Sequence, residues 1–311
     1  MRRMPADDRP EAPGGPVSTP PEPSPPAAPS TSPLGPEDLY LDLLKRVLTR
    51  SGFDSSYRLV PAGRQLRHLP RRALQRALRA GGLQLVMEAD AAMRSEGKDW
   101  PSDAETMIGA LRLDNLQHCI TDVIARGVPG DLIETGVWRG GATIFMRGVL
   151  KAYGVTDRRV WVADSFQGLP KPDPDRFRDD TGDIFWGYDA LAVSIDQVKA
   201  NFERYGLLDD QVRFLPGWFR DTLPTAPIEQ IAVLRLDGDM YESTIVALEA
   251  LYPKLAPGGY AIVDDYKAVD ACKAAVDDYR RDQGITEPIH EIDWGGVFWQ
   301  RMGAATATTA G

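Results

Sequence analysis

The spacing of hydrophobic residues changes near Gly130. Before this point apolar residues recur at helical intervals, which predicts amphipathic helices over Leu39 to Arg50 and over Ala104 to about Arg126. The apolar face of the first helix is expected to carry Leu39, Leu43, Val47 and Leu48. After Gly130, short apolar runs alternate with helical segments, a pattern typical of a parallel sheet with crossover helices. The sequence therefore predicts an α/β fold that follows a helical region.

Five apolar runs are expected to form the parallel strands. They are Asp131 to Thr135, Arg159 to Asp164, Val212 to Leu215, Ile231 to Asp237 and Tyr260 to Asp264. Alternating apolar residues from Pro288 to Arg301 surround the turn Asp293-Trp294-Gly295-Gly296 and predict an antiparallel hairpin at the sheet edge. Five parallel strands with a C-terminal antiparallel hairpin form a Rossmann-like sheet of methyltransferase-like topology.

Composition suggests where the folded part begins. Residues 1–36 hold 12 of the chain's 25 prolines and almost no large apolar side chain, which predicts a disordered tail. Residues 37–129 are expected to form a helical cap, residues 130–302 the main α/β domain, and residues 303–311 a second disordered tail. Six arginines between Arg64 and Arg79 favour the solvated basic face of a short helix over an anion-binding surface.

The charge and the rare residue types exclude several classes of protein. A net charge of −9 argues against nucleic acid as the main partner. Two cysteines and three histidines provide neither a disulfide framework nor a zinc site, which suits a reducing cytosol. No apolar run is long enough to span a bilayer, and the N-terminus lacks an apolar signal core. We therefore expect a cytoplasmic protein with no membrane partner.

The first two strands end in acids, at the edge where parallel sheets bind ligands. Glu134 precedes a glycine-containing turn whose spacing is not G-x-G-x-x-G, which argues against a nicotinamide-dependent oxidoreductase. A carboxylate there suits the ammonium group of an amino-acid-like cofactor. Asp164 can accept hydrogen bonds from a ribose diol, although an isolated aspartate is more often a cap or turn residue. Together they suggest S-adenosylmethionine, and Trp218 after the third strand either stacks on its adenine or belongs to the core.

The fourth and fifth strands end in four more acids. Asp237 and Asp239 follow one strand, and Asp264 and Asp265 follow the next. Crowded like charges are costly unless a cation offsets them, although Asp239 on its own would also suit a helix cap. Oxygen ligands without histidine or cysteine favour Mg²⁺. Such an ion can lower the pKa of a substrate hydroxyl while an aspartate takes the proton.

The order of these motifs resembles the metal-dependent macrocin-type sugar O-methyltransferases of antibiotic biosynthesis. The resemblance extends from Leu39 to Arg301. It rests on the segments LYLDLLKR (39–46), ETMIGALRLDNLQ (105–117), PGDLIETGVWRGGA (129–142), ADSFQGLP (163–170), LLDDQVRFLPGWFRDTLP (207–224), LRLDGDMYEST (234–244) and GGYAIVDDY (258–266). Several long motifs in one order are far more specific than any one of them.

The resemblance implies a class I methyltransferase that uses S-adenosylmethionine and Mg²⁺ to methylate a sugar hydroxyl of a glycosylated natural product, in a possible homo-oligomer. The implied cofactor contacts are Met107, Glu134, Thr135, Gly136, Arg139, Gly140, Asp164, Ser165, Phe166, Gly217, Trp218 and Asp237. The implied metal ligands are Asp237, Asp264 and Asp265. The general base is either Asp237 or Asp239. Mobile segments around Asp99 to Met107 and Asp173 to Tyr188 are expected to cover the site.

Two alternatives stay open. A small-phenol or catechol-type O-methyltransferase would use the same metal chemistry on a flatter acceptor. A non-catalytic glycoside-binding protein would keep the fold alone, since fold does not establish function. An inactive descendant would have no chemical need for Asp237, Asp264 and Asp265 together, so their joint presence favours an enzyme.

Overall fold

A computed structural model describes residues 35–51, 53, 57–60, 69–88 and 90–303. They belong to one compact unit that begins at Gly35. The two predicted tails therefore lie almost wholly outside the described residues. The predicted division of the folded part at residue 130 stays a prediction.

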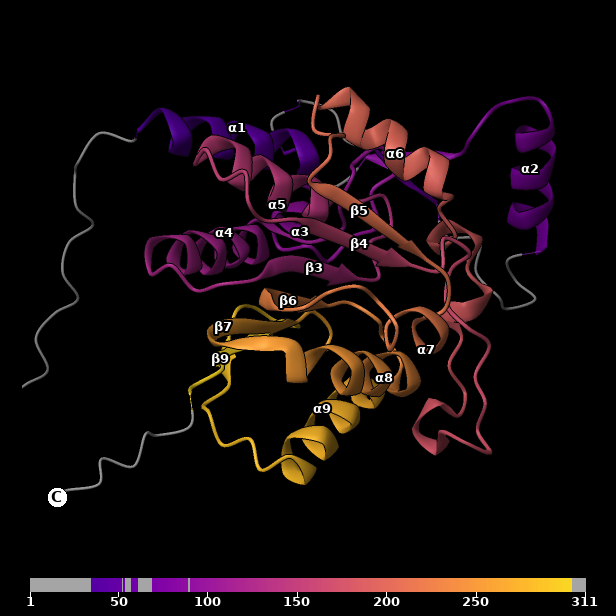
Figure 1. The fold of residues 1–311 in the computed structure, drawn as a ribbon. Coiled ribbons are helices and arrows are strands. Elements are labelled where there is room, and N and C mark those ends of the chain that lie inside the picture. The colour runs from indigo at the N-terminus through magenta and orange to yellow at the C-terminus, as the bar shows by residue number, and fades with distance from the viewer. Residues whose placement is uncertain (1–34, 52, 54–56, 61–68, 89, 304–311) are drawn as a thin grey trace, which may run out of the picture. The chain divides into compact units, whose positions relative to one another are not determined.

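A seven-stranded sheet lies at the centre of this unit, in the order β5-β4-β3-β6-β7-β9-β8 (Figure 1). The strands are β3 (Asp131–Thr135), β4 (Val160–Asp164), β5 (Val212–Pro216), β6 (Ile231–Leu236), β7 (Leu255–Val263), β8 (His290–Glu291) and β9 (Val297–Gln300). The first five pair in parallel, and β9 is antiparallel to both β7 and β8. The predicted α/β fold and its C-terminal hairpin are confirmed.

Helices cover both faces of the sheet and make a three-layer structure (Figure 1). One face carries α1 (Pro36–Thr49), α4 (Ala110–Ala125), α5 (Gly141–Ala152) and α6 (Ile195–Arg204). The other carries α7 (Phe219–Thr222), α8 (Tyr241–Leu251) and α9 (Asp270–Asp282). Successive strand residues point to opposite faces, so Leu132 enters one hydrophobic core and Ile133 the other. Among the described helices, none has both the length and the apolar character needed to cross a bilayer.

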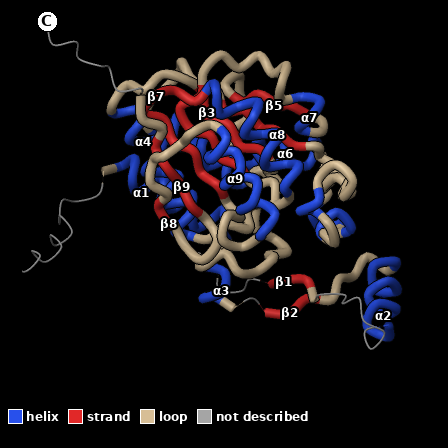
Figure 2. The backbone as a smooth tube through the Cα atoms, turned by 90° about the horizontal axis from the view of Figure 1, so that it is seen from below, coloured by secondary structure: helices blue, strands red, loops and turns tan. Residues whose placement is uncertain are grey.

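Shorter elements lie between α1 and α4. The strands β1 (Tyr57–Leu59) and β2 (Val86–Glu88) form an antiparallel pair that the hydrophobic pattern did not predict. Between them is α2 (Leu69–Ala80), the expected arginine-rich helix, which buries none of its residues. The helix α3 (Ala91–Ser95) follows β2. Figure 2 shows β1, β2 and α2 to one side of the large sheet. Arg64 and Arg67 lie outside the described residues.

The predicted apolar face of α1 was right at Leu48 and wrong at Leu39 and Leu43. Leu41 and Leu48 are fully buried, whereas Leu39 and Leu43 are more than half exposed. Leucines lie on several sides of this helix, so spacing alone did not select the side that faces the protein. The contact with α5 selects that side. The Leu44 side chain packs so closely against Gly148 of α5 that a Cβ atom on Gly148 would clash with it.

Two predicted boundaries were also wrong. Helix α4 begins at Ala110 and not at Ala104. The backbone of Glu105 is held in a non-helical conformation because its N–H donates to the Leu48 carbonyl at 3.1 Å and its carbonyl accepts from Gly141 at 2.9 Å. Strand β7 begins at Leu255, five residues before the predicted start, because its glycine-containing first half pairs with β6 across a register shift.

Candidate active site

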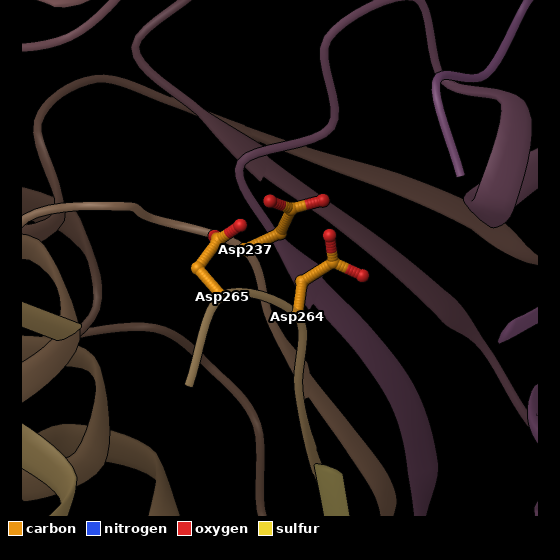
Figure 3. Close-up of side chains that lie close together, drawn as sticks. All are labelled: Asp237, Asp264 and Asp265. Atoms are coloured by element: carbon orange, nitrogen blue, oxygen red, sulfur yellow. The ribbon is translucent and has the colours of Figure 1, made fainter. Parts of the chain in front are cut away.

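The four predicted aspartates line one cavity at the ends of β6 and β7, which we call the acid cavity. Figure 3 shows the carboxylates of Asp237, Asp264 and Asp265 close together. One oxygen from each of these three lies within 4.8 Å of the others. Asp239, the fourth aspartate, lines the same cavity. The structure therefore places together the four acids that the sequence analysis singled out at these strand ends.

Burial and mutual repulsion act on the protonation of these acids. Loss of hydration and the nearby Asp264 charge raise the pKa of Asp237 to about 6. Burial and the Asp237 charge raise the pKa of Asp239 to about 8. The pKa of Asp265 is also well above its usual value, chiefly through burial. Its buried Oδ2 atom has no hydrogen-bond partner among the described residues, so it is available to a cation.

Arg235 in β6 is a site residue that the sequence analysis missed. Its side chain is 1% exposed and forms ion pairs with Glu134, Asp237 and Asp264, at 2.8 Å in the case of Asp237. The buried guanidinium therefore offsets part of the negative charge of the acids, for which the sequence analysis considered only a metal ion. The sequence did contain a sign of this residue, because a single arginine lies inside the apolar run that leads to Asp237.

Arg112 in α4 is the second buried arginine of the site. It forms ion pairs with Asp264 and with Asp293, the latter at 2.8 Å. Its guanidinium also lies 5.1 Å from the ring centroid of Trp294. The C-terminal hairpin is thereby joined to the acid cavity.

The two arginines balance only part of the negative charge. Six carboxylates belong to this group: Glu134, Asp237, Asp239, Asp264, Asp265 and Asp293. When ionised they exceed the two arginine charges by four. A divalent cation therefore fits the oxygen donors and the remaining charge of the acid cavity.

Glu134 has one engaged and one open oxygen. Its Oε1 accepts a hydrogen bond from Arg235, while its Oε2 is buried without a partner among the described residues. Burial raises the pKa of this carboxyl to about 8. Glu134 lines the acid cavity, so the open oxygen can serve a ligand as the sequence analysis expected.

A second cavity, which we call the Asp164 cleft, adjoins the first. Its walls include Gly136, Asp164, Ser165 and Trp218. Asp164 Oδ2 accepts the Val137 N–H at 2.8 Å, and Oδ1 accepts the Phe166 N–H at 2.7 Å. Asp164 is therefore both a turn residue and part of a ligand cleft. Burial raises its pKa despite these hydrogen bonds.

Several residues that the resemblance implied do not line either cavity. They are Thr135, Arg139, Gly140, Phe166 and Gly217. Thr135 is buried within β3, and Phe166 packs into the hydrophobic core. Arg139 donates to the carbonyls of Ser102 at 3.0 Å and Ala104 at 2.9 Å, so it fixes the segment before α4.

The two predicted covering segments contact each other beside the acid cavity. Trp100 and Tyr188 meet edge to face with 5.4 Å between ring centroids. The segment of Tyr188 is also anchored to α8, because the buried Asp180 accepts the N–H groups of Tyr241 at 2.6 Å and Glu242 at 3.0 Å. This carboxylate caps the helix that begins just after Asp239.

The segment before α4 is anchored by a buried ion pair. Arg94 contacts Asp99 at 2.8 Å and donates to the carbonyls of Met107 at 2.6 Å and Ile108 at 2.9 Å. Met107 is thereby held where the two cavities adjoin.

The acid cavity and the Asp164 cleft share part of their walls. The shared residues are Met107, Trp138, Leu191, Asp237 and Asp239. A ligand in one cavity would therefore approach a ligand in the other beside two carboxylates. The sheet order is that of the class I methyltransferase fold, and the acids lie at the strand ends where such sheets bind ligands.

Comparison with known proteins gives the family. The model of the macrocin-O-methyltransferase (TylF) family matches residues 37–301, so the chain belongs to this family and is an O-methyltransferase. It is 55% identical over 269 residues to the 8-demethyl-8-(2,3-dimethoxy-alpha-L-rhamnosyl)-tetracenomycin-C 4'-O-methyltransferase of Streptomyces olivaceus, covering 86% of this chain and 94% of that protein.

Two further relatives agree with this assignment. The mycinamicin III 3''-O-methyltransferase of Micromonospora griseorubida is 50% identical over 267 residues, which cover 85% of this chain and 96% of that protein. The solved structure of the O-methyltransferase NovP superposes with a TM-score of 0.74 at 48% identity, covering 86% of this chain and all of that chain. The resemblance inferred from the motifs is confirmed.

Proposed function

We propose that the chain transfers a methyl group from S-adenosylmethionine, with Mg²⁺ as cofactor, to a sugar hydroxyl of a glycosylated natural product. The observation that carries the proposal is the junction of the two cavities at Asp237 and Asp239. Donor and acceptor that occupied the two cavities would face each other there, and methyl transfer depends on such alignment. The activities named for the relatives support the sugar as acceptor.

The Asp164 cleft is the proposed binding site of the nucleoside part of the donor. Asp164 and Ser165 lie where a ribose would bind, and Trp218 offers its ring to the adenine. The open Oε2 of Glu134 suits the ammonium group of the methionine part. The Asp164 cleft thus offers a hydrogen-bond acceptor for the ribose diol, and the adjoining acid cavity offers one for the ammonium group.

In the acid cavity, Asp237, Asp264 and Asp265 are the proposed ligands of Mg²⁺. A bound divalent ion would act as a Lewis acid that lowers the pKa of a coordinated hydroxyl. Asp239 is the better candidate for the general base, because among the described side chains it takes no part in the ion pairs of Arg235 and Arg112. Its raised pKa, about 8, suits proton transfer near neutral pH.

The proposed activity is tested by calorimetry followed by a transfer assay. S-adenosylmethionine and S-adenosylhomocysteine should bind while NAD⁺ does not, and Asp164→Ala should weaken binding whereas Asp189→Ala, an exposed aspartate outside both cavities, should not. Methyl transfer to a rhamnosylated tetracenomycin should require Mg²⁺ and stop with EDTA. Transfer to catechol but to no glycoside would favour the small-phenol alternative, and binding of neither adenosyl compound would contradict the proposal.

We also expect Mg²⁺ to stabilise the protein more at about pH 8 than at about pH 5.5. The folded-state pKa of Asp237, about 6, and that of Asp239, about 8, lie above the unfolded value of 3.8. The folded protein therefore binds more protons than the unfolded chain in this range, and without metal its stability falls as pH rises. Mg²⁺ binds the ionised carboxylates and reverses this loss.

Thermal unfolding with and without Mg²⁺ at the two pH values measures the effect. Asp265→Asn, which removes a proposed ligand charge, is the comparison variant and should lose most of the response to Mg²⁺. An equal rise in Tm at both pH values would show that these acids do not bind the ion.

A further inference from the structure

Three of the chain's seven tryptophans are exposed, namely Trp100 at 41%, Trp186 at 46% and Trp294 at 41%. Large aromatic side chains left this open at a cavity are typical of ligand contacts. Trp100 and Trp294 line the acid cavity, whereas Trp186 is not among the described residues that line either cavity. Trp186 belongs to the covering segment 173–188 and follows Phe185, which lines the acid cavity.

The ring of Trp294 is held in one place. Its Nε1 donates to the carbonyl of Glu96 at 2.8 Å, and the guanidinium of Arg112 lies 5.1 Å from its centroid. The turn that carries it is fixed too, because Asp293 Oδ1 accepts the N–H groups of Gly295 at 2.9 Å and Gly296 at 2.8 Å. A ring anchored this way loses little conformational entropy when it binds a ligand.

Trp100 is anchored through its neighbours. Its ring meets Tyr188 at 5.4 Å, and the preceding residue, Asp99, is buried in the ion pair with Arg94. Both tryptophans are therefore presented from backbone that polar contacts hold in position.

We propose that Trp294, together with Trp100, forms a subsite that binds the apolar aglycone of the acceptor, while the sugar extends to Asp237 and Asp239. The inference rests on the proposed function and adds the division of the acid cavity into two parts. The strand ends provide carboxylates, which suit hydroxyl groups, and the tryptophans provide flat apolar surface, which suits an aromatic or polyketide ring system. The excess of negative charge in the cavity also disfavours an acceptor that carries phosphates.

The test compares one sugar with and without an aglycone. In the presence of Mg²⁺ and S-adenosylhomocysteine, which prevents turnover, calorimetry measures binding of 8-demethyl-8-(2,3-dimethoxy-α-L-rhamnosyl)-tetracenomycin C and of methyl 2,3-di-O-methyl-α-L-rhamnoside. We expect the wild type to bind the first at least about tenfold more tightly, as buried aromatic contacts commonly provide. Trp294→Ala should lose most of this preference, and Trp294→Phe should keep part of it. Tyr153→Ala, which removes an exposed ring that lines neither cavity, should leave it unchanged.

Mn²⁺ binding, followed by electron paramagnetic resonance, shows whether the acid cavity survives in Trp294→Ala. A preference lost while Mn²⁺ and S-adenosylhomocysteine still bind supports the subsite. A wild type that binds S-adenosylhomocysteine but shows no preference, or a Trp294→Ala variant that keeps it, overturns the inference and leaves the proposed methyl transfer standing. A wild type that does not bind S-adenosylhomocysteine overturns both. Tighter binding of a thymidine diphosphate sugar than of the glycoside would also overturn the subsite.

Discussion

Asp239→Asn is expected to lower kcat for methyl transfer by about 10²- to 10⁴-fold, the range typical of a lost general base. The amide keeps the size of the carboxylate but cannot accept the proton of the sugar hydroxyl. Asparagine also tolerates the left-handed backbone at this position, where φ is 55°. The loss should therefore reflect chemistry and not a rearranged turn. Rapid-quench measurement of a single turnover, with S-adenosylhomocysteine affinity determined in parallel, gives the result.

Asp237→Asn is the matched comparison, because both variants exchange one carboxylate for an amide in the same cavity. It removes a proposed Mg²⁺ ligand that also pairs with Arg235 at 2.8 Å, so metal affinity should fall along with kcat. Asp239→Asn should instead keep its Mg²⁺ affinity. If Asp239→Asn turns over at the wild-type rate, Asp237 is the base and our assignment of the two roles is wrong.

Arg235→Met is expected to lower the free energy of unfolding by about 3–5 kcal/mol, as when one partner of a buried ion pair is removed. Its 1% exposed guanidinium is replaced by an uncharged chain, while Glu134, Asp237 and Asp264 stay together without it. Urea unfolding followed by circular dichroism measures the loss. Addition of Mg²⁺ should recover part of it, because a cation then offsets the same acids.

An exposed arginine provides the control for this variant. Arg281 pairs with Asp278 at 2.6 Å and with Asp282 at 3.0 Å, but its side chain is 67% exposed. Arg281→Met should leave the free energy of unfolding nearly unchanged, because exposed ion pairs contribute little to stability. Similar losses in the two variants would show that the Arg235 network contributes no more than a surface pair.

The strand pattern and the acids at strand ends were sufficient to predict the α/β sheet and the cluster of Asp237, Asp264 and Asp265. Parallel strands bring their carboxyl ends to one edge, so residues distant in sequence were placed together without any knowledge of contacts. The position of Asp164 followed from the same rule. These features depend on local pattern and on topology, which the sequence displays directly.

The two arginines did not follow from pattern. Arg235 lies in a buried strand, where a charged residue is rare unless paired, and its partners become visible only when three strands are side by side. Arg112 pairs with Asp293, a residue 181 positions away. The non-helical segment around Glu105 was missed for the same reason, since its hydrogen bonds go to Leu48 and Gly141. Long-range contacts, and not local propensity, determine the positions of Arg235 and Arg112 and the conformation of the segment around Glu105.

The position of β9 affects how this protein must be made. Among the described strands it is the last in sequence, yet it lies between β7 and β8. While the ribosome is still completing the chain, β7 therefore has an open edge of unpaired N–H and C=O groups, which other chains can pair with. Synthesis that stops before Val297 leaves this edge uncovered. The expected product of premature termination is an aggregating polypeptide and not a weaker enzyme.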